Sequence, residues 1–396
     1  MKLDRDDIVL VAGVRTAFGT FCGTLREISA NDLGVVVAKA AVERSGFAPD
    51  EIDHVIFGNA LQTSKDAIYC ARHVALKAGL PERTPAVTVN RLCGSGFESI
   101  IQATRQIVTG ESEVVLAGGT ENMSQAPHTV RGARWGIPLG QSKLGDVLWD
   151  ALYDPYAGYS MAETAENLAE KYGLSREEVD DFAYRSQMRT KEAQEAGRFD
   201  EEIVPVEVQK KREHVAFDTD EHPRPGTTKE VLAGLPPYFK EDGFVTAGNA
   251  SGIVDGAAAV IVTTAERAGR ADAPVIGRLL GWGIAGCDPE IMGIGPAPST
   301  RTALKDTGLS LEELELYEVN EAFAPQTVAV MKELGLDHEK LNVNGGAIAI
   351  GHPLAATGTR VTITLLYEMR RRGAKRGFAS ACIGGGQGAT VVVEAV

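Results

Sequence analysis

Two cysteines and one histidine stand beside glycine-rich segments, a combination that suits covalent catalysis by a thiol. Cys93 lies in VNRLCGSGFESI, between a predicted strand over residues 86–90 and an amphipathic helix. A helix amino terminus offers unpaired N–H groups and a positive dipole end, which favour the nucleophilic thiolate. Gly94 and Gly96 remove side chains that would block a ligand. Cys93 is therefore the candidate nucleophile, although a free cysteine is more often a small buried hydrophobe.

His352 and Cys382 are the candidate partners of Cys93. His352 precedes Pro353, a residue typical of a first helical turn, so its ring is expected to be exposed at a helix start, where it can take a proton from a cysteine. Cys382 ends a predicted strand in SACIGGGQG, and the glycines after it, Gly384 among them, can direct N–H groups at an oxyanion. Each residue alone also has a purely structural interpretation. Together they offer a nucleophile, its base and a group that moves a substrate proton.

Two further polar residues have open interpretations. Asn320 ends a predicted strand in VNEAFAP, where it either caps a helix starting at Ala322 or orients a water molecule. Arg224 lies between two prolines in the charged stretch 210–229, the best basic cluster of the chain. That stretch is either a solvated loop or a phosphate contact, since a guanidinium group can bind phosphate with two hydrogen bonds.

The elements that must position these residues follow an α/β pattern with an internal repeat. Short β-branched runs alternate with helical stretches, and continuous apolar strands indicate sheets covered on both faces. Residues 40–60 and 302–322 share the order helix, glycine, acidic turn, strand, asparagine. Residues 89–96 and 343–353 each place a glycine-rich turn before a long helix. Two similar half-domains, each a sheet with packed helices, are predicted.

The predicted domain boundaries follow from this repeat. The first half comprises residues 1–120 with a return segment at 246–270, and the second half comprises residues 271–396. Residues 121–245 form an insertion whose composition differs. Within it, Ser175 and Glu178 match a capping box, which predicts a helix running to about Gly197.

Composition excludes several classes of protein. The 396 residues carry 40 Lys and Arg against 54 Asp and Glu, a net charge of −14, which argues against binding nucleic acid. Five cysteines without a CxxC pair fit neither a disulfide framework nor a zinc site. No apolar run approaches the roughly 20 residues of a membrane span. The amino terminus MKLDRDDIVL lacks the pattern of a signal or transit peptide, so a cytoplasmic protein is expected.

Six motifs in order resemble the thiolase family over nearly the whole chain: VNRLCGSGFESI, TAGNASGIVDGAAA, IMGIGP, VNEAFAP, NGGAIAIGHPLAATGTR and SACIGGGQG. The resemblance implies two α/β halves in a layered α-β-α-β-α core with an inserted loop domain that binds coenzyme A. It also implies that Cys93 accepts the acyl group, that His352 activates Cys93, and that Cys382 is the acid/base at the α carbon of acetyl-CoA. Asn320 would hold a water that lines one oxyanion hole with His352, and the N–H groups of Cys93 and Gly384 would form the other.

The resemblance further implies the ligands and the assembly. Coenzyme A and acyl-CoA are substrates, no metal or redox cofactor is needed, and a homodimer or homotetramer is expected, with residues 131–145 as an assembly arm. Residues implied to bind coenzyme A are Arg224 near the nucleotide, Ser251 on the pantetheine arm, and Leu152, Phe239, Met292 and Phe323 along the channel.

The implied reaction is thiolytic cleavage of a 3-ketoacyl-CoA to acetyl-CoA and a shortened acyl-CoA, or the reverse Claisen condensation. Short-chain acetoacetyl-CoA thiolases typically have a histidine where this chain has Ser160, and other surroundings resemble degradative 3-ketoacyl-CoA thiolases of fatty acid breakdown. Condensation of two acetyl-CoA molecules by an acetoacetyl-CoA thiolase is the alternative. A neutral surface change is the other interpretation of Ser160.

Three rival functions are less favoured. A β-ketoacyl synthase shares the duplicated fold, but the Cys382 motif and VNEAFAP disfavour it. A non-catalytic acyl-CoA-binding relative would have lost a catalytic residue, and none is lost here. A nucleotide-binding dehydrogenase would need GxGxxG after a strand with an acid about 20 residues on, a pattern that the sequence lacks.

Overall fold

The predicted α/β architecture is confirmed by the computed structural model, which describes residues 8–140, 143–210 and 212–396. No helix in this described part is both long and apolar enough to cross a membrane. Strands and helices of the first half are β1 (Ile8–Thr16), β2 (Gly19–Thr20), α1 (Ala30–Ser45), β3 (His54–Gly58), α2 (Cys70–Lys77), β4 (Ala86–Val89), α3 (Ser95–Thr109), β5 (Val114–Glu121), β13 (Val254–Thr264) and α8 (Ala265–Arg270). Those of the second half are β14 (Val275–Gly286), α9 (Pro296–Thr307), β15 (Leu316–Val319), α10 (Ala324–Leu334), α11 (Ala347–Ile350), α12 (Leu354–Arg372), β16 (Arg376–Ile383) and β17 (Gln387–Glu394).

The strand order shows the internal duplication. The main path of the large sheet runs β15-β16-β17-β14-β1-β13-β5-β3-β4, and the antiparallel pair β1 and β14 joins the two halves. From this junction outward, β1-β13-β5-β3-β4 is matched by β14-β17-β16-β15 and a bridge from Tyr317 to Leu341. In both series the third and fourth strands are parallel to each other. The same topology therefore occurs twice, as the sequence repeat predicts.

The repeated sequence segments also fold alike. Each begins with a helix that ends at a glycine in the left-handed conformation, a backbone state that favours glycine because it has no Cβ atom. A short acidic 3-10 turn, a strand and an asparagine follow. The paired features are Gly46 (φ 79°) and Gly308 (φ 70°), the turns Pro49–Glu51 and Leu311–Glu313, strands β3 and β15, and Asn59 and Asn320.

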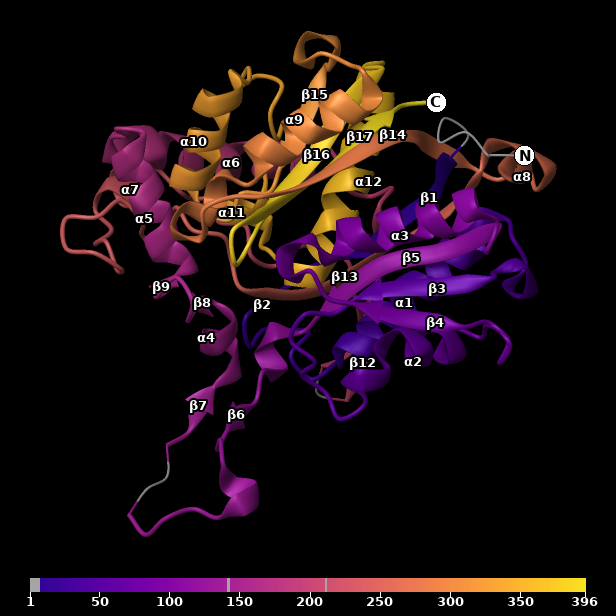
Figure 1. The fold of residues 1–396 in the computed structure, drawn as a ribbon, viewed down its shortest axis with the longest axis horizontal. Coiled ribbons are helices and arrows are strands. Elements are labelled where there is room, and N and C mark those ends of the chain that lie inside the picture. Colours follow the sequence, from indigo (N-terminus) through magenta and orange to yellow (C-terminus); the bar gives the residue numbers. More distant parts are fainter. Residues whose placement is uncertain (1–7, 141–142, 211) are drawn as a thin grey trace.

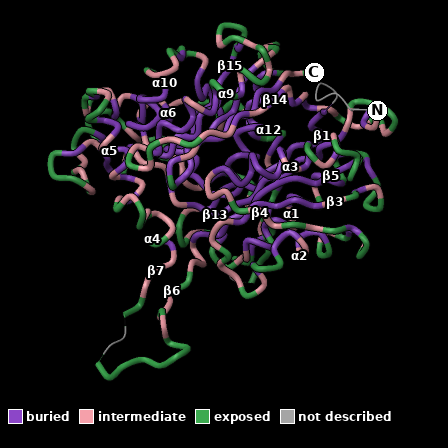
Figure 2. Tube along the Cα trace, viewed as in Figure 1, coloured by how far each residue is buried: buried purple, intermediate pink, exposed green. Residues whose placement is uncertain are grey.

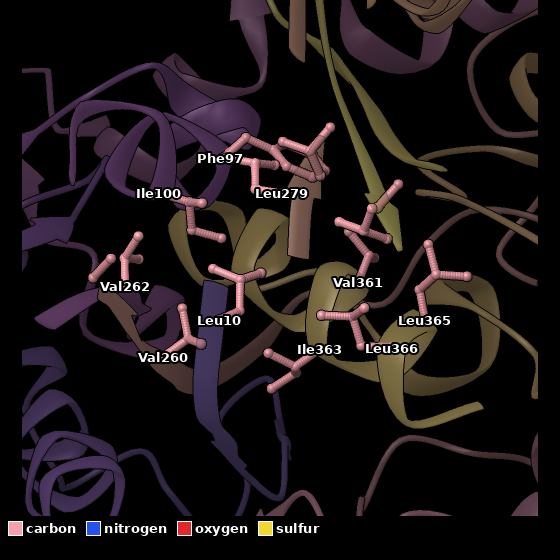
Figure 3. Packing of buried hydrophobic residues seen from close by; sticks show 14 of the residues in the cluster. Leu10, Phe97, Ile100, Val260, Val262, Leu279, Val361, Ile363, Leu365 and Leu366 are labelled. Carbon is pink, nitrogen blue, oxygen red and sulfur yellow. The ribbon is translucent and has the colours of Figure 1, made fainter. Parts of the chain in front are cut away.

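Helices α3 and α12 form the middle layer of the molecule (Figure 1). On one side they pack against β3, β5 and β13, whose other face is covered by α1 and α2. On the other side α12 packs against β15 and β16, and α9 covers the far face of β14, β16 and β17. Figure 3 shows part of an apolar cluster at this centre, where Phe97 and Ile100 of α3 and Val361 of α12 lie near Leu10 and Val260 of the strands. The order is α-β-α-β-α, and buried apolar side chains fill its centre.

Two glycines allow α3 and α12 to touch along their backbones. A Cβ atom on Gly96 would lie 2.4 Å from the backbone nitrogen of Thr359, and one on Gly358 would lie 2.3 Å from that of Phe97. A Cβ atom on Gly94 would lie 2.5 Å from Ile383. The expectation that Gly94 and Gly96 clear space for a ligand is therefore wrong, because protein atoms fill that space. Gly96 and Gly358 let the starts of α3 and α12 pack directly against each other.

Part of the segment between β5 and β13 projects from the layers (Figure 1), whereas its short strand β10 (Ile203–Val204) pairs with β1 in the large sheet. Residues on its projecting arm are largely exposed (Figure 2), including Trp135, Ile137, Leu139 and Leu144, of which Leu139 is fully exposed at 103%. The elements of this segment are β6 (His128–Thr129), β7 (Gly145–Asp146), α4 (Val147–Ala151), β8 (Tyr153–Asp154), β9 (Tyr159–Ser160), α5 (Met161–Lys171), α6 (Arg176–Glu195), β10 (Ile203–Val204), β11 (Val206–Lys210), β12 (Glu213–Phe217) and α7 (Lys229–Ala233). The helix predicted after Ser175 is α6, capped by the Ser175 hydroxyl on the N–H of Glu178.

Candidate active site

Cys93 lies in a single 3-10 turn, Leu92–Gly94, that connects β4 to α3. Leu92 adopts a left-handed conformation, with φ 48°, which is uncommon for a residue with a side chain and costs backbone strain. The Cys93 side chain is partly exposed and packs against the apolar cluster of Met123, Leu148 and Leu354. The turn therefore presents the sulfur atom at the amino end of α3, at the edge of the core.

The resting Cys93 is a thiol, contrary to the sequence expectation. Burial raises the pKa of the Cys93 thiol to about 11, although the backbone N–H groups of Gly384 and of Cys93 itself act to lower it. The helix amino terminus favours the thiolate as predicted, but desolvation outweighs that effect. Cys93 needs a base to react at neutral pH, and two N–H donors already lie at its sulfur atom.

Cys382 lies close to Cys93, although 289 positions separate them in the chain, by subtraction of the residue numbers. It is the penultimate residue of β16 and is buried at 1% exposure. Burial, together with the charge that Cys93 and Cys287 would carry, raises the pKa of Cys382 well above its usual value. Cys382 therefore rests as a protonated thiol beside the first sulfur atom. Its apolar neighbours are Met292, Ala322, Met161 and Phe323.

His352 is buried at 5% exposure, so the expectation of an exposed ring is wrong. It lies one residue before Pro353, which precedes the first residue of α12 rather than beginning the helix. Burial and the nearby positive charge of Arg360 lower the pKa of His352 to about 3, so the imidazole is neutral at physiological pH. Its Nδ1 lies 2.6 Å from the hydroxyl oxygen of Thr357, whereas Nε2 is buried without a partner among the described residues.

Contacts of its neighbours bring His352 to the same region as the two cysteines. Leu354, two residues after His352, shares the apolar cluster of Cys93. The His352 N–H donates to the carbonyl oxygen of Gly252 at 2.9 Å, and Ile253 packs against the same cluster. The two sulfur atoms and the imidazole therefore belong to one interior region built from both halves of the chain.

Asn320 follows β15 directly and is buried at 1% exposure. Neither Oδ1 nor Nδ2 of its side chain has a hydrogen-bond partner in the described part of the chain. The alternative that Asn320 caps a helix from Ala322 is wrong, because α10 begins at Ala324 with Phe323 before it. A buried amide without partners is costly, so an unpaired Asn320 fits a polar guest such as water.

A pocket of about 570 Å³ is lined by three residues implied to bind coenzyme A, namely Arg224, Phe239 and Ser251. The other three pack in apolar clusters that also contain Cys93, Cys382 or Phe239. Phe323 packs near Phe239 in one cluster and near Cys382 in another, where Met292 also lies, and Leu152 packs in the Cys93 cluster. Shared clusters thus connect Phe239 of the pocket to Cys382 through Phe323.

Several residues around the site have no sequence signal that we used. His222 lines the pocket, and its Nδ1 lies 2.8 Å from the carbonyl oxygen of Ala349. The exposed Tyr238 lines the same pocket and makes an edge contact with Phe239. His222 is two residues from Arg224, so the charged stretch that flagged Arg224 was the available signal for it.

Glu121 ties the active-site segments together at the end of β5. It is fully buried and accepts hydrogen bonds from the N–H groups of Ala60, Leu61 and Ala355 and from the side-chain amide of Asn59. Burial raises the pKa of Glu121 to about 7, and these backbone donors oppose that rise. Ala355 is in the first turn of α12, so Glu121 attaches the helix that follows His352 to the first half.

Two family models match the chain: the thiolase N-terminal domain over residues 8–266 and the thiolase C-terminal domain over residues 273–395. The mitochondrial 3-ketoacyl-CoA thiolase of Bos taurus is 52% identical over 388 residues, 98% of each chain. The acetyl-CoA acetyltransferase of Pseudomonas aeruginosa is 51% identical over 389 residues, 98% of this chain and 99% of the relative.

Solved structures agree with this match and with the predicted layered fold. The crystal structure of human mitochondrial 3-ketoacyl-CoA thiolase superimposes with a TM-score of 0.97 at 52% identity, covering 99% of both chains. The structure of the same human enzyme in complex with CoA gives a TM-score of 0.96 at 52% identity, covering 99% of this chain and 98% of the other.

The predicted cytoplasmic location is contradicted by the relatives. The 3-ketoacyl-CoA thiolases of Bos taurus and Homo sapiens, each 52% identical over 98% of this chain, are mitochondrial. The prediction depended on the first ten residues, of which 1–7 lie outside the described residues. Charge and hydropathy at those positions do not report the compartment in which the folded enzyme works.

Proposed function

The chain belongs to the thiolase family, and from this premise we propose how its residues cleave a 3-ketoacyl-CoA. The protein is an acyltransferase that produces acetyl-CoA and a shortened acyl-CoA, or catalyses the reverse Claisen condensation. The observation that carries the proposed roles is the meeting of Cys93, Cys382 and an unpartnered, neutral His352 in one interior region.

In the first half-reaction the Cys93 sulfur attacks the 3-keto carbon while Nε2 of His352 takes the thiol proton. Support for this order comes from the high pKa of Cys93, about 11, and from the neutral state of His352. The C2–C3 bond then breaks, its electron pair goes to C2 of the leaving acetyl-CoA, and Cys382 donates its proton there. We propose that the N–H groups of Cys93 and Gly384 stabilise the oxyanion of an acyl group on the sulfur, a role supported by their effect in lowering the pKa of the Cys93 thiol.

After the first half-reaction, the proton held by His352 returns to the Cys382 sulfur. In the second half-reaction the thiol of coenzyme A attacks the Cys93 thioester and gives its proton to His352, which passes that proton to the Cys93 sulfur as the shortened acyl-CoA leaves. A water held between Asn320 and His352 lines the second oxyanion hole, a role supported by the unpaired polar atoms of both side chains. Thioester is exchanged for thioester, so neither half-reaction is trapped in a deep energy well. We propose that coenzyme A is a substrate and that the chemistry needs no further cofactor.

Coenzyme A enters through the pocket that Arg224, Phe239 and Ser251 line. Arg224 is exposed, lies in the stretch predicted to contact phosphate, and its backbone is held by a hydrogen bond from its N–H to Gln187. The human relative was crystallised with CoA, which supports the same ligand here. In this proposal the inserted segment 121–245 supplies most of the coenzyme A site, and residues 1–120 with 246–270 and residues 271–396 supply the catalytic halves.

Replacing Arg224 by alanine is expected to raise the KM for coenzyme A in thiolysis about tenfold and to change kcat little, because a charge-assisted bond to phosphate is lost far from the reacting atoms. Steady-state kinetics at several salt concentrations measure this effect. Arg212→Ala, in the same charged stretch but outside the pocket lining, is the control. An unchanged KM in Arg224→Ala would remove Arg224 from the coenzyme A site.

The proposed substrate class is 3-ketoacyl-CoA, with acetoacetyl-CoA thiolase activity as the second candidate because of the acetyltransferase relative at 51% identity. Ser160 is not a surface residue. It is buried at 2% exposure and caps α5 in a reciprocal pair with Glu163. Thiolysis rates for acetoacetyl-, 3-ketohexanoyl- and 3-ketodecanoyl-CoA decide between the two candidates. Zero rates on all three would contradict the enzymatic proposal.

We propose a homodimer or homotetramer in which the projecting arm contacts another copy. Support comes from the apolar side chains at its surface, since Trp135 is 85% exposed and Leu139 103% exposed. Single chains rarely leave such a group of large apolar residues in water. At the other side of the molecule β4 is an edge strand whose Val87 is 42% exposed. An edge strand of this kind is open to pairing with a second copy.

Leu139→Asp is expected to shift the largest assembly of this protein to a smaller one, because a charge replaces an apolar contact at the arm. Sedimentation velocity at several protein concentrations measures the shift. Val231→Asp, at another exposed apolar position on α7, is the control and should leave the sedimentation of the wild type unchanged. Identical sedimentation of Leu139→Asp and the wild type would rule out the arm as the contact.

A further inference from the structure

The hydroxyl group of Thr357 makes two contacts in the first turn of α12. Its oxygen lies 2.6 Å from Nδ1 of His352 and 3.1 Å from the carbonyl oxygen of Pro353. Thr357 is fully buried and His352 is 95% buried, so water does not compete for these groups. Nδ1 of His352 has the hydroxyl as its partner, whereas Nε2 has no partner among the described residues.

The number of available protons decides which ring nitrogen of His352 carries hydrogen. A threonine hydroxyl has one proton to donate and lone pairs to accept. The carbonyl oxygen of Pro353 can only accept, so the contact between the two oxygens requires the hydroxyl proton. The contact to Nδ1 then exists only if Nδ1 brings its own proton and the hydroxyl oxygen accepts it. In the opposite tautomer the same proton would have to serve both acceptors.

The cost of the unpaired ring nitrogen favours the same tautomer. With the proton on Nδ1, the buried and unpartnered Nε2 is a lone pair. With the proton on Nε2, it would be a buried N–H donor without an acceptor, which is rarer in folded proteins than an under-used acceptor. The neutral form is the relevant one here, since His352 holds no second proton at physiological pH.

We propose that Thr357 is a positioning residue that keeps the proton of His352 on Nδ1 and so leaves the Nε2 lone pair available for the Cys93 proton. This inference rests on the proposed role of His352 as the base of Cys93. Thr357 also fixes the ring plane, because it lies five residues after His352 on a helix start that cannot shift. The N–H of Ala355 is bound to Glu121, and Gly358 lies against the backbone of Phe97.

Three variants test the proposal. Thr357→Val keeps the volume and removes the hydroxyl, so Nδ1–H loses its acceptor and the tautomer with Nε2–H becomes populated. Thr357→Ser restores the hydroxyl. Thr362→Val is the matched control, because Thr362 is equally buried on α12 and its hydroxyl donates to the carbonyl oxygen of Gly358 without touching a histidine.

The main readout is the single-turnover rate of Cys93 acylation from an acyl-CoA, followed by mass spectrometry. Thr357→Val should lower that rate about 10- to 100-fold, as losses of groups that orient a catalytic histidine do. KM for coenzyme A should stay near the wild-type value, Thr357→Ser should recover most of the rate, and Thr362→Val should acylate like the wild type. Both valine variants should unfold at a lower temperature than the wild type, and Thr357→Val at the lowest, because its hydroxyl makes two buried hydrogen bonds and that of Thr362 makes one.

The role proposed for Thr357 can fail separately from the role proposed for His352. If His352→Gln is inactive but Thr357→Val acylates at the wild-type rate, Thr357 does not set the tautomer. If His352→Gln itself acylates normally, the proposed function fails first. Should Thr357→Val not fold, ¹⁵N NMR of the histidine-labelled wild type, with His352 assigned from His352→Gln, decides the matter. A proton on Nδ1 supports the proposal, and a proton on Nε2 overturns it.

Discussion

Cys93→Ala is expected to abolish acyl-enzyme formation and to lower thiolysis by a factor on the order of 10⁴ or more. Covalent transfer needs a sulfur atom at this turn, where two N–H donors lie beside it. The neighbouring Cys382 is not expected to take over, because it lies near the end of β16 rather than at a helix start. Incubation with acetoacetyl-CoA without coenzyme A, followed by intact-protein mass spectrometry, measures the acyl adduct.

The control for Cys93→Ala is Cys22→Ala, which removes an exposed free thiol elsewhere on the molecule. It should keep both the adduct and the thiolysis rate. Pocket binding should survive in Cys93→Ala, so the affinity for coenzyme A in a calorimetric titration should remain close to wild type. An acyl adduct on a different residue in Cys93→Ala, at the wild-type rate, would contradict the proposed nucleophile.

The position of Cys93, the proposed nucleophile, was predictable from the sequence because it depends on the local order of strand, turn and helix. A strand, a turn with glycines and an amphipathic helix place Cys93 at a helix start, and the strand and glycine pattern around Cys382 places it at a strand end. The repeat was predictable for the same reason, since Gly46 and Gly308 both end helices before acidic turns. Turns, helix starts and strand ends of this type are determined by neighbouring residues, so the folded structure contains them where the sequence predicts them.

The electrostatic state of the site was not predictable, because it depends on what covers each residue. The helix start was expected to make Cys93 a thiolate, but burial raises its pKa to about 11. His352 was expected to be exposed, but it is buried beside the segment that contains Gly252 and lies within reach of the charge of Arg360. Desolvation comes from chain segments far apart in sequence, and no motif records it.

Cooperation between distant segments also explains the misassigned glycines. Gly94 and Gly96 follow Cys93 closely, and they were expected to leave space for a ligand. Gly96 instead faces the backbone of Thr359 in α12, and Gly94 faces the side chain of Ile383 in β16. A glycine in the sequence indicates only that some group approaches the backbone closely. Whether that group is a ligand or another part of the chain becomes clear only from the folded structure.

Cys382→Ser is expected to separate the two chemical steps. Acyl transfer between an acyl-CoA and coenzyme A through Cys93 needs no proton at an α carbon, so it should continue. Cleavage of the C2–C3 bond needs an acid at that carbon, and a serine hydroxyl is a much weaker acid than a thiol. The rate of acetoacetyl-CoA thiolysis should therefore fall about 10²- to 10⁴-fold, the usual contribution of general acid catalysis.

The resting state of Cys382 favours this role in the direction of cleavage. Its raised pKa keeps the proton on sulfur until a carbanion forms next to it. Cys287→Ser is the matched control, because Cys287 is a nearby thiol whose pKa burial also raises, to about 11. Exchange of labelled coenzyme A into an acyl-CoA measures acyl transfer through Cys93. Loss of acetoacetyl-CoA absorbance measures cleavage of the C2–C3 bond together with acyl transfer. If Cys382→Ser slows exchange and cleavage equally, the proposed division of roles is wrong. Cys93 would then not be the residue for acyl transfer alone, nor Cys382 the residue for proton transfer at the α carbon alone.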